Sequence, residues 1–339
     1  MITLPYLLQH ENICRLEGKH LLIGDRRAFP FEKRFEVCSS VDQVAESLRA
    51  MVTQGGGPLE VALQTMVWVT RLMQSGELRG GFATLADAAK QLMAARPTNT
   101  TMQRALQSLL AAVKDSASDL EALDHAVQTQ VDLMLEGYDR LYHQMGRMGS
   151  TLLKQDSVVL TTCFAEHTFL LSLAYAKESG KHVRVLANET RPYLQGSRLT
   201  APSLKEMGIE VQVITDGMGA SFLHAGKVDM YMTAVDLLCM DGTVVNKVGT
   251  LSNAIAARYC NVPYYAFSIS PDPTKQGGAD VTMEMRSPSE VTRCMGSPTT
   301  LDSIGALYPA FDIIPSELVT ALVTPKGILE PEHVKRNFP

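Results

Sequence analysis

From residue 156 onward, short apolar runs alternate with segments whose apolar positions recur at helical spacing. The runs are rich in β-branched residues, which favours buried strands, and the intervening segments favour helices. The predicted strands cover 158–163, 183–188, 210–216, 228–236 and 262–267. Strands separated by helices of this length build a parallel sheet with helices on both faces. This half of the chain is therefore predicted to be a Rossmann-like α/β domain.

The first part of the chain has a different pattern. Two short runs, 20–25 and 31–38, predict strands, and apolar positions then recur at helical spacing from Ser40, a candidate N-cap. Further helices are predicted over 59–73, 86–95, 101–113 and 120–147. We expect a small β element and a helical domain over residues 1–148, followed by the α/β domain over 149–339.

Composition narrows the class of protein. No apolar run approaches the roughly 18 residues that span a bilayer, and the N-terminus does not resemble a signal peptide, so we expect a cytoplasmic protein without membrane contact. The net charge of −5 is spread along the chain without a Lys/Arg run, which argues against nucleic-acid binding. The six cysteines form no CxxC pair, so neither a zinc site nor a disulfide framework is expected.

Chemistry is expected where the predicted strands end. In an open parallel sheet, ligands bind outside the carboxyl ends of the strands. Four successive strands end at Cys163, Glu189, Asp216 and Asp236. Three carboxylates and a thiol at one rim indicate a polar ligand or shifted pKa values, and helix N-termini at that rim favour a phosphate.

Each candidate has a simpler interpretation. A single cysteine at a strand end is more often a buried apolar residue, and Asp216 is as well explained as a helix cap. The glycines of 55–58 lie between two predicted helices, where a turn is favoured over a phosphate loop. Lys247 could extend its side chain to solvent.

Residues 188–200, Asn-Glu-Thr-Arg-Pro-Tyr-Leu-Gln-Gly-Ser-Arg-Leu-Thr, resemble the ETRPYLQGARLT signature of S-methyl-5-thioribose-1-phosphate isomerases. That family shares a superfamily with ribose-1,5-bisphosphate isomerases and with regulatory subunits of the translation-initiation exchange factor. Shorter matches in the same order occur at Leu16–Gly18, Ala95–Thr98, Thr162–Cys163, Val235–Asp236, Asp241–Gly242, Asn246–Thr250 and Phe311–Leu318.

The resemblance implies an aldose–ketose isomerase of methionine salvage that converts a ribose 1-phosphate into a ribulose 1-phosphate. It implies Asp236 as a catalytic acid, protonated in an apolar pocket, and Cys163 as a thiolate base near helix N-termini. The substrate-binding residues that it implies are Gly55, Gly56, Gly57, Arg96, Gln195, Asn246 and Lys247. A homodimer is expected, with a sugar phosphate as ligand and with no metal or cofactor.

This sequence departs from the family where the anion is bound. Gly55 stands where the family has an arginine, Leu237 replaces a second arginine, and Phe164 and Glu166 alter the loop after Cys163. We therefore expect a related but different substrate, such as a deoxypentose 1-phosphate. The alternative is a non-catalytic protein of the same superfamily that binds a sugar phosphate or nucleotide. A nicotinamide-dependent enzyme is disfavoured, because no G-x-G-x-x-G follows the first strand of the α/β domain.

Overall fold

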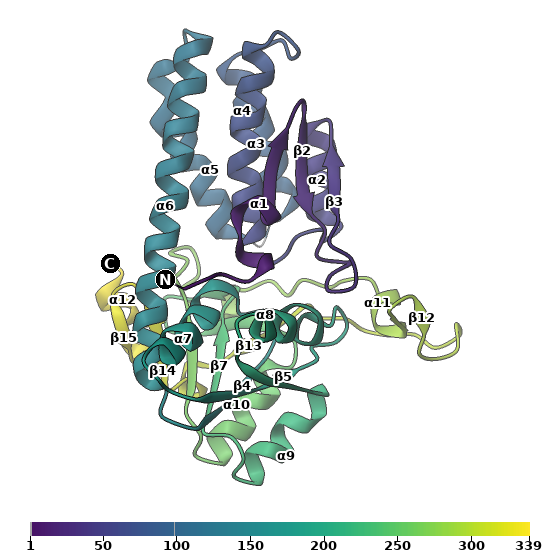
Figure 1. The fold of residues 1–339 in the computed structure, drawn as a ribbon, viewed down its shortest axis with the longest axis vertical. Helices are drawn as coiled ribbons and strands as arrows, with labels where there is room; N and C mark the ends of the chain where they lie inside the picture. The colour runs from purple at the N-terminus through teal and green to yellow at the C-terminus, as the bar shows by residue number, and fades with distance from the viewer. Residues whose placement is uncertain (1, 98) are drawn as a thin grey trace. The chain divides into compact units, whose positions relative to one another are not determined.

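A computed structural model describes residues 2–97 and 99–339, and Thr98 of the Ala95–Thr98 match lies outside the described residues. The chain forms two compact units (Figure 1). The N-terminal unit is Tyr6–Arg140, and the C-terminal unit is Leu141–Pro339 with the short segment before Tyr6. The helix α6 (Leu120–Leu152) contributes to both units, and residue 148, the expected boundary, falls within it.

The N-terminal unit packs helices against a small antiparallel sheet of order β1-β2-β3. Its strands are β1 (Cys14–Glu17), β2 (His20–Gly24) and β3 (Phe35–Cys38). Its helices are α1 (His10–Ile13), α2 (Val41–Arg49), α3 (Gly57–Gln74), α4 (Phe82–Ala95), α5 (Thr100–Val113) and the first part of α6. The predicted cap is confirmed, because Ser40 Oγ accepts the Gln43 N–H of α2 at 3.3 Å.

The strand predicted over 31–38 is shorter in the structure, where β3 begins only at Phe35. The preceding residues fold back around the buried carboxylate of Asp25. The side chains of Arg27 and Arg34 each donate a hydrogen bond to it through Nε at 2.9 Å. This ion cluster stabilises residues 26–34 as a loop. The alternating side chains of the sequence predict a strand over 31–38 and do not indicate the ion cluster.

The C-terminal unit contains a seven-stranded sheet of order β15-β14-β10-β7-β4-β5-β6. All neighbouring strands are parallel except β14 and β15. The strands are β4 (Ser157–Thr161), β5 (Val183–Asn188), β6 (Glu210–Ile214), β7 (Met230–Ala234), β10 (Tyr264–Phe267), β14 (Ala321–Thr324) and β15 (Gly327–Leu329). The predicted Rossmann-like α/β fold is confirmed.

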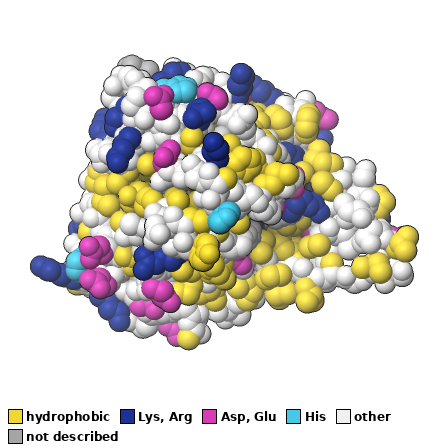
Figure 2. Space-filling view, turned by 90° about the horizontal axis from the view of Figure 1, so that it is seen from below, with side chains coloured by type: hydrophobic (Ala, Val, Ile, Leu, Met, Phe, Trp, Pro, Cys, Tyr) yellow, Lys and Arg dark blue, Asp and Glu magenta, His cyan; other side chains and the backbone are white. Residues whose placement is uncertain are grey.

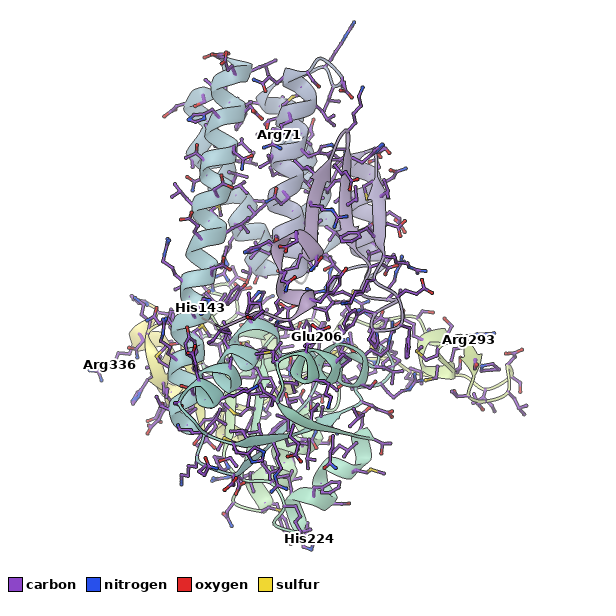
Figure 3. All side chains as sticks on the ribbon, in the orientation of Figure 1. Arg71, His143, Glu206, His224, Arg293 and Arg336 are labelled. Atoms are coloured by element: carbon purple, nitrogen blue, oxygen red, sulfur yellow. The ribbon has the colours of Figure 1, made fainter. Side chains whose placement is uncertain are left out.

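Helices cover both faces of this sheet. Figure 1 shows α7 (Glu166–Glu178) and α8 (Ala201–Glu206) on one side, and α9 (Gly219–His224) and α10 (Thr250–Tyr259) on the other. The end of α6 packs beside α7, where His143 Nδ1 (labelled in Figure 3) lies 2.8 Å from the Tyr175 hydroxyl. Lys181 donates to the carbonyls of Ser150 and Leu153 at 3.0 and 2.7 Å, which stabilises the C-terminal end of α6.

A second, three-stranded sheet of order β13-β9-β8 was not predicted. Its strands are β8 (Leu237–Leu238), β9 (Val244–Lys247) and β13 (Phe311–Ile314). The antiparallel pair β9 and β13 joins segments more than sixty residues apart and places Asn246 opposite Asp312. A further short hairpin, β11 (Arg293–Cys294) and β12 (Ser297–Pro298), forms a projecting arm of this unit (Figure 1).

The visible surface of the C-terminal unit carries mixed charge. Figure 2 shows basic and acidic side chains interspersed around a central hydrophobic band. Within the described residues, every helix is too short or too polar to cross a membrane.

His10 ties three helices of the N-terminal unit together. Its Nδ1 lies 2.9 Å from Glu60 Oε1 of α3, and its Nε2 lies 3.0 Å from Asp139 Oδ2 of α6. The hydrogen bonds to Asp139 and Glu60 raise the pKa of His10 to about 10. Burial raises the pKa of Glu60, and the charged imidazolium of His10 opposes that effect. His10 is therefore a structural cation in neutral solution.

We predict that His10→Gln lowers the melting temperature by a few degrees near pH 6. The pKa of His10 is higher in the folded protein than its ordinary value of 6.5, so its contribution is complete below pH 6.5 and is lost as pH rises through about 10. The difference between variant and wild type should therefore vanish in melting curves above about pH 10. His224→Gln, at an exposed position of α9, is the control and should melt like the wild type throughout. A pH-independent difference for His10→Gln would contradict the pairing.

Candidate active site

The strand order of the large sheet reverses between β4 and β7. These strands are neighbours, and Val159 of β4 lies opposite Met230 of β7. From β4 the chain continues to β5 on one side, whereas from β7 it continues to β10 on the other side. Ligands of such sheets bind at this switch point, outside the carboxyl ends of the strands. Cys163 and Asp236 each follow the last residue of one of these two strands by two positions. The predicted pair thus lies just beyond the carboxyl ends of two adjacent strands.

The backbone of Cys163 is left-handed, with φ of 69°, which is a strained conformation for a residue with a β-carbon. Two threonines hold it there. The Cys163 N–H donates to Thr190 Oγ1 at 2.9 Å, and the Thr200 hydroxyl donates to the Cys163 carbonyl at 2.6 Å. Thr190 and Glu166 also have positive φ, of 64° and 41°. Strain collected around one side chain is typical of functional sites.

Asp216, one of the predicted rim acids, has a structural role. Its carboxylate accepts the N–H of Thr190 at 2.8 Å and the N–H of Arg191 at 2.7 Å. It therefore supports the turn after β5 rather than capping its own helix, and both of its oxygens are engaged. Glu189 is half-buried, and its pKa is raised by burial and then by the neighbouring Asp216.

A buried polar network lies beneath the rim. Asn188 Oδ1 accepts hydrogen bonds from Thr162 Oγ1 at 3.2 Å and from Asn253 Nδ2 at 2.9 Å. The Tyr231 hydroxyl donates to Thr162 Oγ1 at 2.8 Å. Residues of β5, β7, α10 and the loop after β4 are thereby tied together, which fixes the loops above them.

Lys247, the last residue of β9, is buried rather than extended to solvent, with 4% of its surface exposed. Its ammonium lies 4.8 Å from the centre of the Phe311 ring and 5.6 Å from that of Tyr193. The ammonium has no hydrogen bond or ion pair within the described parts of the chain. Burial lowers the pKa of Lys247, while the nearby Cys163 and Asp236 oppose this effect. Such a poorly compensated cation is suited to an anionic ligand.

The thiol of Cys163 is protonated in the ligand-free protein. Burial raises its pKa to about 12, and the charge of Lys247 offsets this only in part. The thiolate expected from helix N-termini is therefore scarce, because loss of hydration outweighs the nearby positive charge. Asp236 is exposed, in contrast to the apolar pocket expected around a catalytic acid.

Two further predicted substrate-binding residues lie in the C-terminal unit. Gln195 is 2% exposed, and its Oε1 has no hydrogen-bond partner within residues 2–97 and 99–339. Asn246 is also buried, and its amide donates to Thr250 Oγ1 at 3.1 Å. A buried acceptor without a partner, such as Gln195 Oε1, costs free energy unless a ligand or water completes it.

The other predicted binding residues belong to the N-terminal unit, and their part in the site stays a prediction. Gly55, Gly56 and Gly57 form the turn that starts α3, as the simpler interpretation expected, with φ of 63° at Gly55. Arg96 ends α4 and directs Nη1 to the sulfur of Met51 at 3.1 Å.

Three residues near Cys163 were not predicted. Arg286 donates through Nη1 to the Tyr193 hydroxyl at 2.8 Å, and the Tyr193 ring meets that of Tyr308 edge-on at a centroid distance of 6.2 Å. Tyr193 stood within the recognised signature and could have been found. Arg286 and Tyr308 come from irregular segments without periodicity, so no pattern in the sequence indicates them.

Among the described residues, one group could share a metal ion: Glu330, Glu332 and His333, all exposed. It contains none of the predicted site residues.

Residues 59–331 match the initiation factor 2 subunit family. The chain is 33% identical to methylthioribose-1-phosphate isomerase of Thermotoga maritima over 332 residues, covering 94% of this chain and 96% of that protein. It is 32% identical to the protein of that name from Chloroflexus aurantiacus over 329 residues, covering 94% and 95%.

Two solved structures are similar over nearly the whole chain. The 5-methylthioribose 1-phosphate isomerase of Pyrococcus horikoshii gives a TM-score of 0.82 at 26% identity, covering 96% of this chain and 94% of that one. The delta subunit of translation initiation factor eIF-2B from A. fulgidus gives 0.79 at 27% identity, covering 95% and 96%.

Gly196 gives a direct test of the turn after β5. A β-carbon there would lie 1.6 Å from the Asn188 carbonyl oxygen, which is backbone and cannot move aside. We predict that Gly196→Ala lowers the free energy of unfolding by about 2 kcal/mol or more, measured by urea titration. Gly217→Ala is the matched control, because its β-carbon would meet nothing within 4 Å. Equal stability of the two variants would show that this turn is not tightly packed.

Proposed function

The chain belongs to the initiation factor 2 subunit family, and from this premise we propose that it is an aldose–ketose isomerase acting on a ribose 1-phosphate. The substrate is 5-methylthioribose 1-phosphate or a related sugar, such as a deoxypentose 1-phosphate, and the product is the corresponding ribulose 1-phosphate. The relatives named as isomerases support this reaction class. The observation that carries the proposal is the convergence of the Cys163 thiol, the Asp236 carboxyl group and the buried Lys247 ammonium at the switch point.

The chemistry requires protonation of the ring oxygen and transfer of a hydrogen between two carbons. Phosphate on the anomeric oxygen locks the sugar as a ring, so a donor must protonate the ring oxygen for the ring to open. Hydrogen must then move from C2 to C1, and the C2 hydroxyl becomes the carbonyl by losing its proton, which balances the proton gained by the ring oxygen. No oxidant or reductant is consumed. We assign the donor role to Asp236, the acceptor role at C2 to Cys163, and phosphate binding to Lys247.

The raised pKa of Cys163 determines the pH dependence of its reactivity. Far below a pKa of about 12, the thiolate fraction rises tenfold with each pH unit. We predict that the rate at which iodoacetamide alkylates Cys163, with Cys163→Ser as the background, rises about tenfold with each pH unit between about pH 6 and 9. In an assay of ketose formation, Cys163→Ser and Asp236→Asn should each lose about a hundredfold or more in kcat.

The same assay in heavy water reports on the hydrogen transfer. Deuterium at C1 of the product shows that the hydrogen passes through an exchanging base and not as a hydride, which supports Cys163 as that base. Full turnover by Cys163→Ser, or an alkylation rate that does not change with pH, would reject the assignment of Cys163 as the base.

Lys247→Met should separate stability from function. It removes a buried charge but keeps the length of the side chain, so the melting temperature of the free protein should hold or rise. The KM for the sugar phosphate should increase about tenfold or more, because a charge-assisted contact to phosphate is lost. Lys227→Met is the control at an exposed position and should change neither quantity. A lower melting temperature with unchanged KM would make Lys247 structural.

The second candidate is a non-catalytic protein that binds a sugar phosphate or nucleotide. The similarity to the A. fulgidus delta subunit favours it, because that structure shares the fold at comparable identity. A panel of pentose 1-phosphates distinguishes the two candidates: ketose formation supports the isomerase, and stabilisation without turnover supports the binding protein. For either candidate we propose a homodimer, which light scattering of the purified chain tests.

A further inference from the structure

Tyr308 is a buried tyrosine whose hydroxyl is left unpaired. The residue is 2% exposed, and its hydroxyl has no hydrogen-bond partner within residues 2–97 and 99–339. Its backbone carbonyl accepts the N–H of Arg286 at 2.9 Å, which fixes this part of the chain. The side chain is thus held in place while its polar end is unsatisfied.

The hydroxyl belongs to a cluster of polar groups beside Lys247, whose ammonium lies 5.6 Å from the centre of the Tyr193 ring. The rings of Tyr308 and Tyr193 meet at 65°, and Arg286 bonds Tyr193 through Nη1. Arg286 Nε and Glu290 Oε2 are likewise buried and without a partner within the described chain. Burial and the nearby Tyr193 raise the pKa of Tyr308, and Cys163 and Glu290 act in the same direction. Several buried hydrogen-bond donors and acceptors without protein partners within the described chain therefore lie in the same cluster.

A second buried tyrosine of the same unit shows the ordinary arrangement. Tyr264 is 1% exposed, and its hydroxyl pairs with Thr233 Oγ1 at 2.8 Å. A buried hydroxyl without such a partner is destabilising, and most buried polar groups avoid that state. A ligand that brings its own hydroxyl groups or phosphate oxygens would complete the hydrogen bonds around Tyr308.

We propose that Tyr308 determines the specificity of the site by hydrogen-bonding one hydroxyl group of the bound sugar phosphate. This inference rests on the proposed isomerase function and adds a contact to it. Arg286 is the positioning residue of this contact, because it holds both the Tyr193 hydroxyl and the backbone of Tyr308.

The test compares Tyr308→Phe with Tyr264→Phe in the full chain. Each substitution removes one oxygen atom and keeps the ring. Without ligand, Tyr308→Phe should melt at the wild-type temperature or higher, whereas Tyr264→Phe should melt lower because it breaks a formed hydrogen bond. With the sugar phosphate that the wild type turns over, Tyr308→Phe should lose about ten- to a hundredfold in kcat/KM. Tyr264→Phe should stay within about twofold of the wild type, because its hydroxyl bonds only to the protein.

A panel of sugar 1-phosphates, each lacking one hydroxyl, provides a readout that a structural role would not change. One of these analogues should be a poor substrate for the wild type, and Tyr308→Phe should no longer distinguish it from the complete sugar. Equal losses on all sugars, or no loss at all, would overturn the inference.

The two proposals can fail separately. A wild type that is stabilised by a sugar phosphate but forms no ketose overturns the isomerase function. In that case, equal stabilisation of the wild type and Tyr308→Phe overturns the role of Tyr308, and reduced stabilisation of the variant supports it. A wild type that is neither stabilised by any member of the panel nor active on it overturns both.

Discussion

The hydrogen bond from the Cys163 N–H to Thr190 Oγ1 is the contact on which the candidate site depends. Cys163 adopts a left-handed backbone that the free chain rarely visits, so the surrounding structure must supply the free energy that keeps it there. Thr190 is itself left-handed and is held by the Asp216 carboxylate. A chain of contacts thus runs from the end of β6 through the turn after β5 to the thiol. A change at Asp216 would alter the direction of the thiol although Asp216 does not reach the chemistry.

The site collects polar groups that the ligand-free protein does not satisfy. The Lys247 ammonium is buried against two rings, and the Tyr308 hydroxyl has no partner within the described residues. Each of these two groups raises the free energy of the folded state. The cost is recovered only when a ligand supplies charge or hydrogen bonds of matching geometry. Relief of this local instability therefore contributes to the free energy of ligand binding, and a ligand that lacks the matching groups binds less tightly.

The sequence predicted those parts of the fold that depend on local periodicity. The central strands β4 to β7 and β10 and the long helices followed from their apolar patterns, and the rule for strand ends brought Cys163 and Asp236 to one rim. The pairing of β9 with β13 was not predictable in this way, because it joins two short segments distant in the sequence. For that reason the local pattern allows Lys247 to extend to solvent, although β9 buries it. Arg286 and Tyr308 depend on the same distant contacts and carry no periodic signal.

The burial of Lys247 and Cys163 has different consequences for the two candidate functions. A protein that only binds a phosphate gains most from exposed cations, which stay hydrated in the free state and cost little to maintain. Burial weakens the charge of Lys247 at equilibrium, as its lowered pKa indicates, and burial also keeps most of the Cys163 thiol protonated. These losses are useful where charge develops during a reaction, because fixed groups with little hydration stabilise a transition state more than a ground state. A buried ammonium beside a protonated thiol is therefore a costly design for a sensor and a reasonable one for an isomerase.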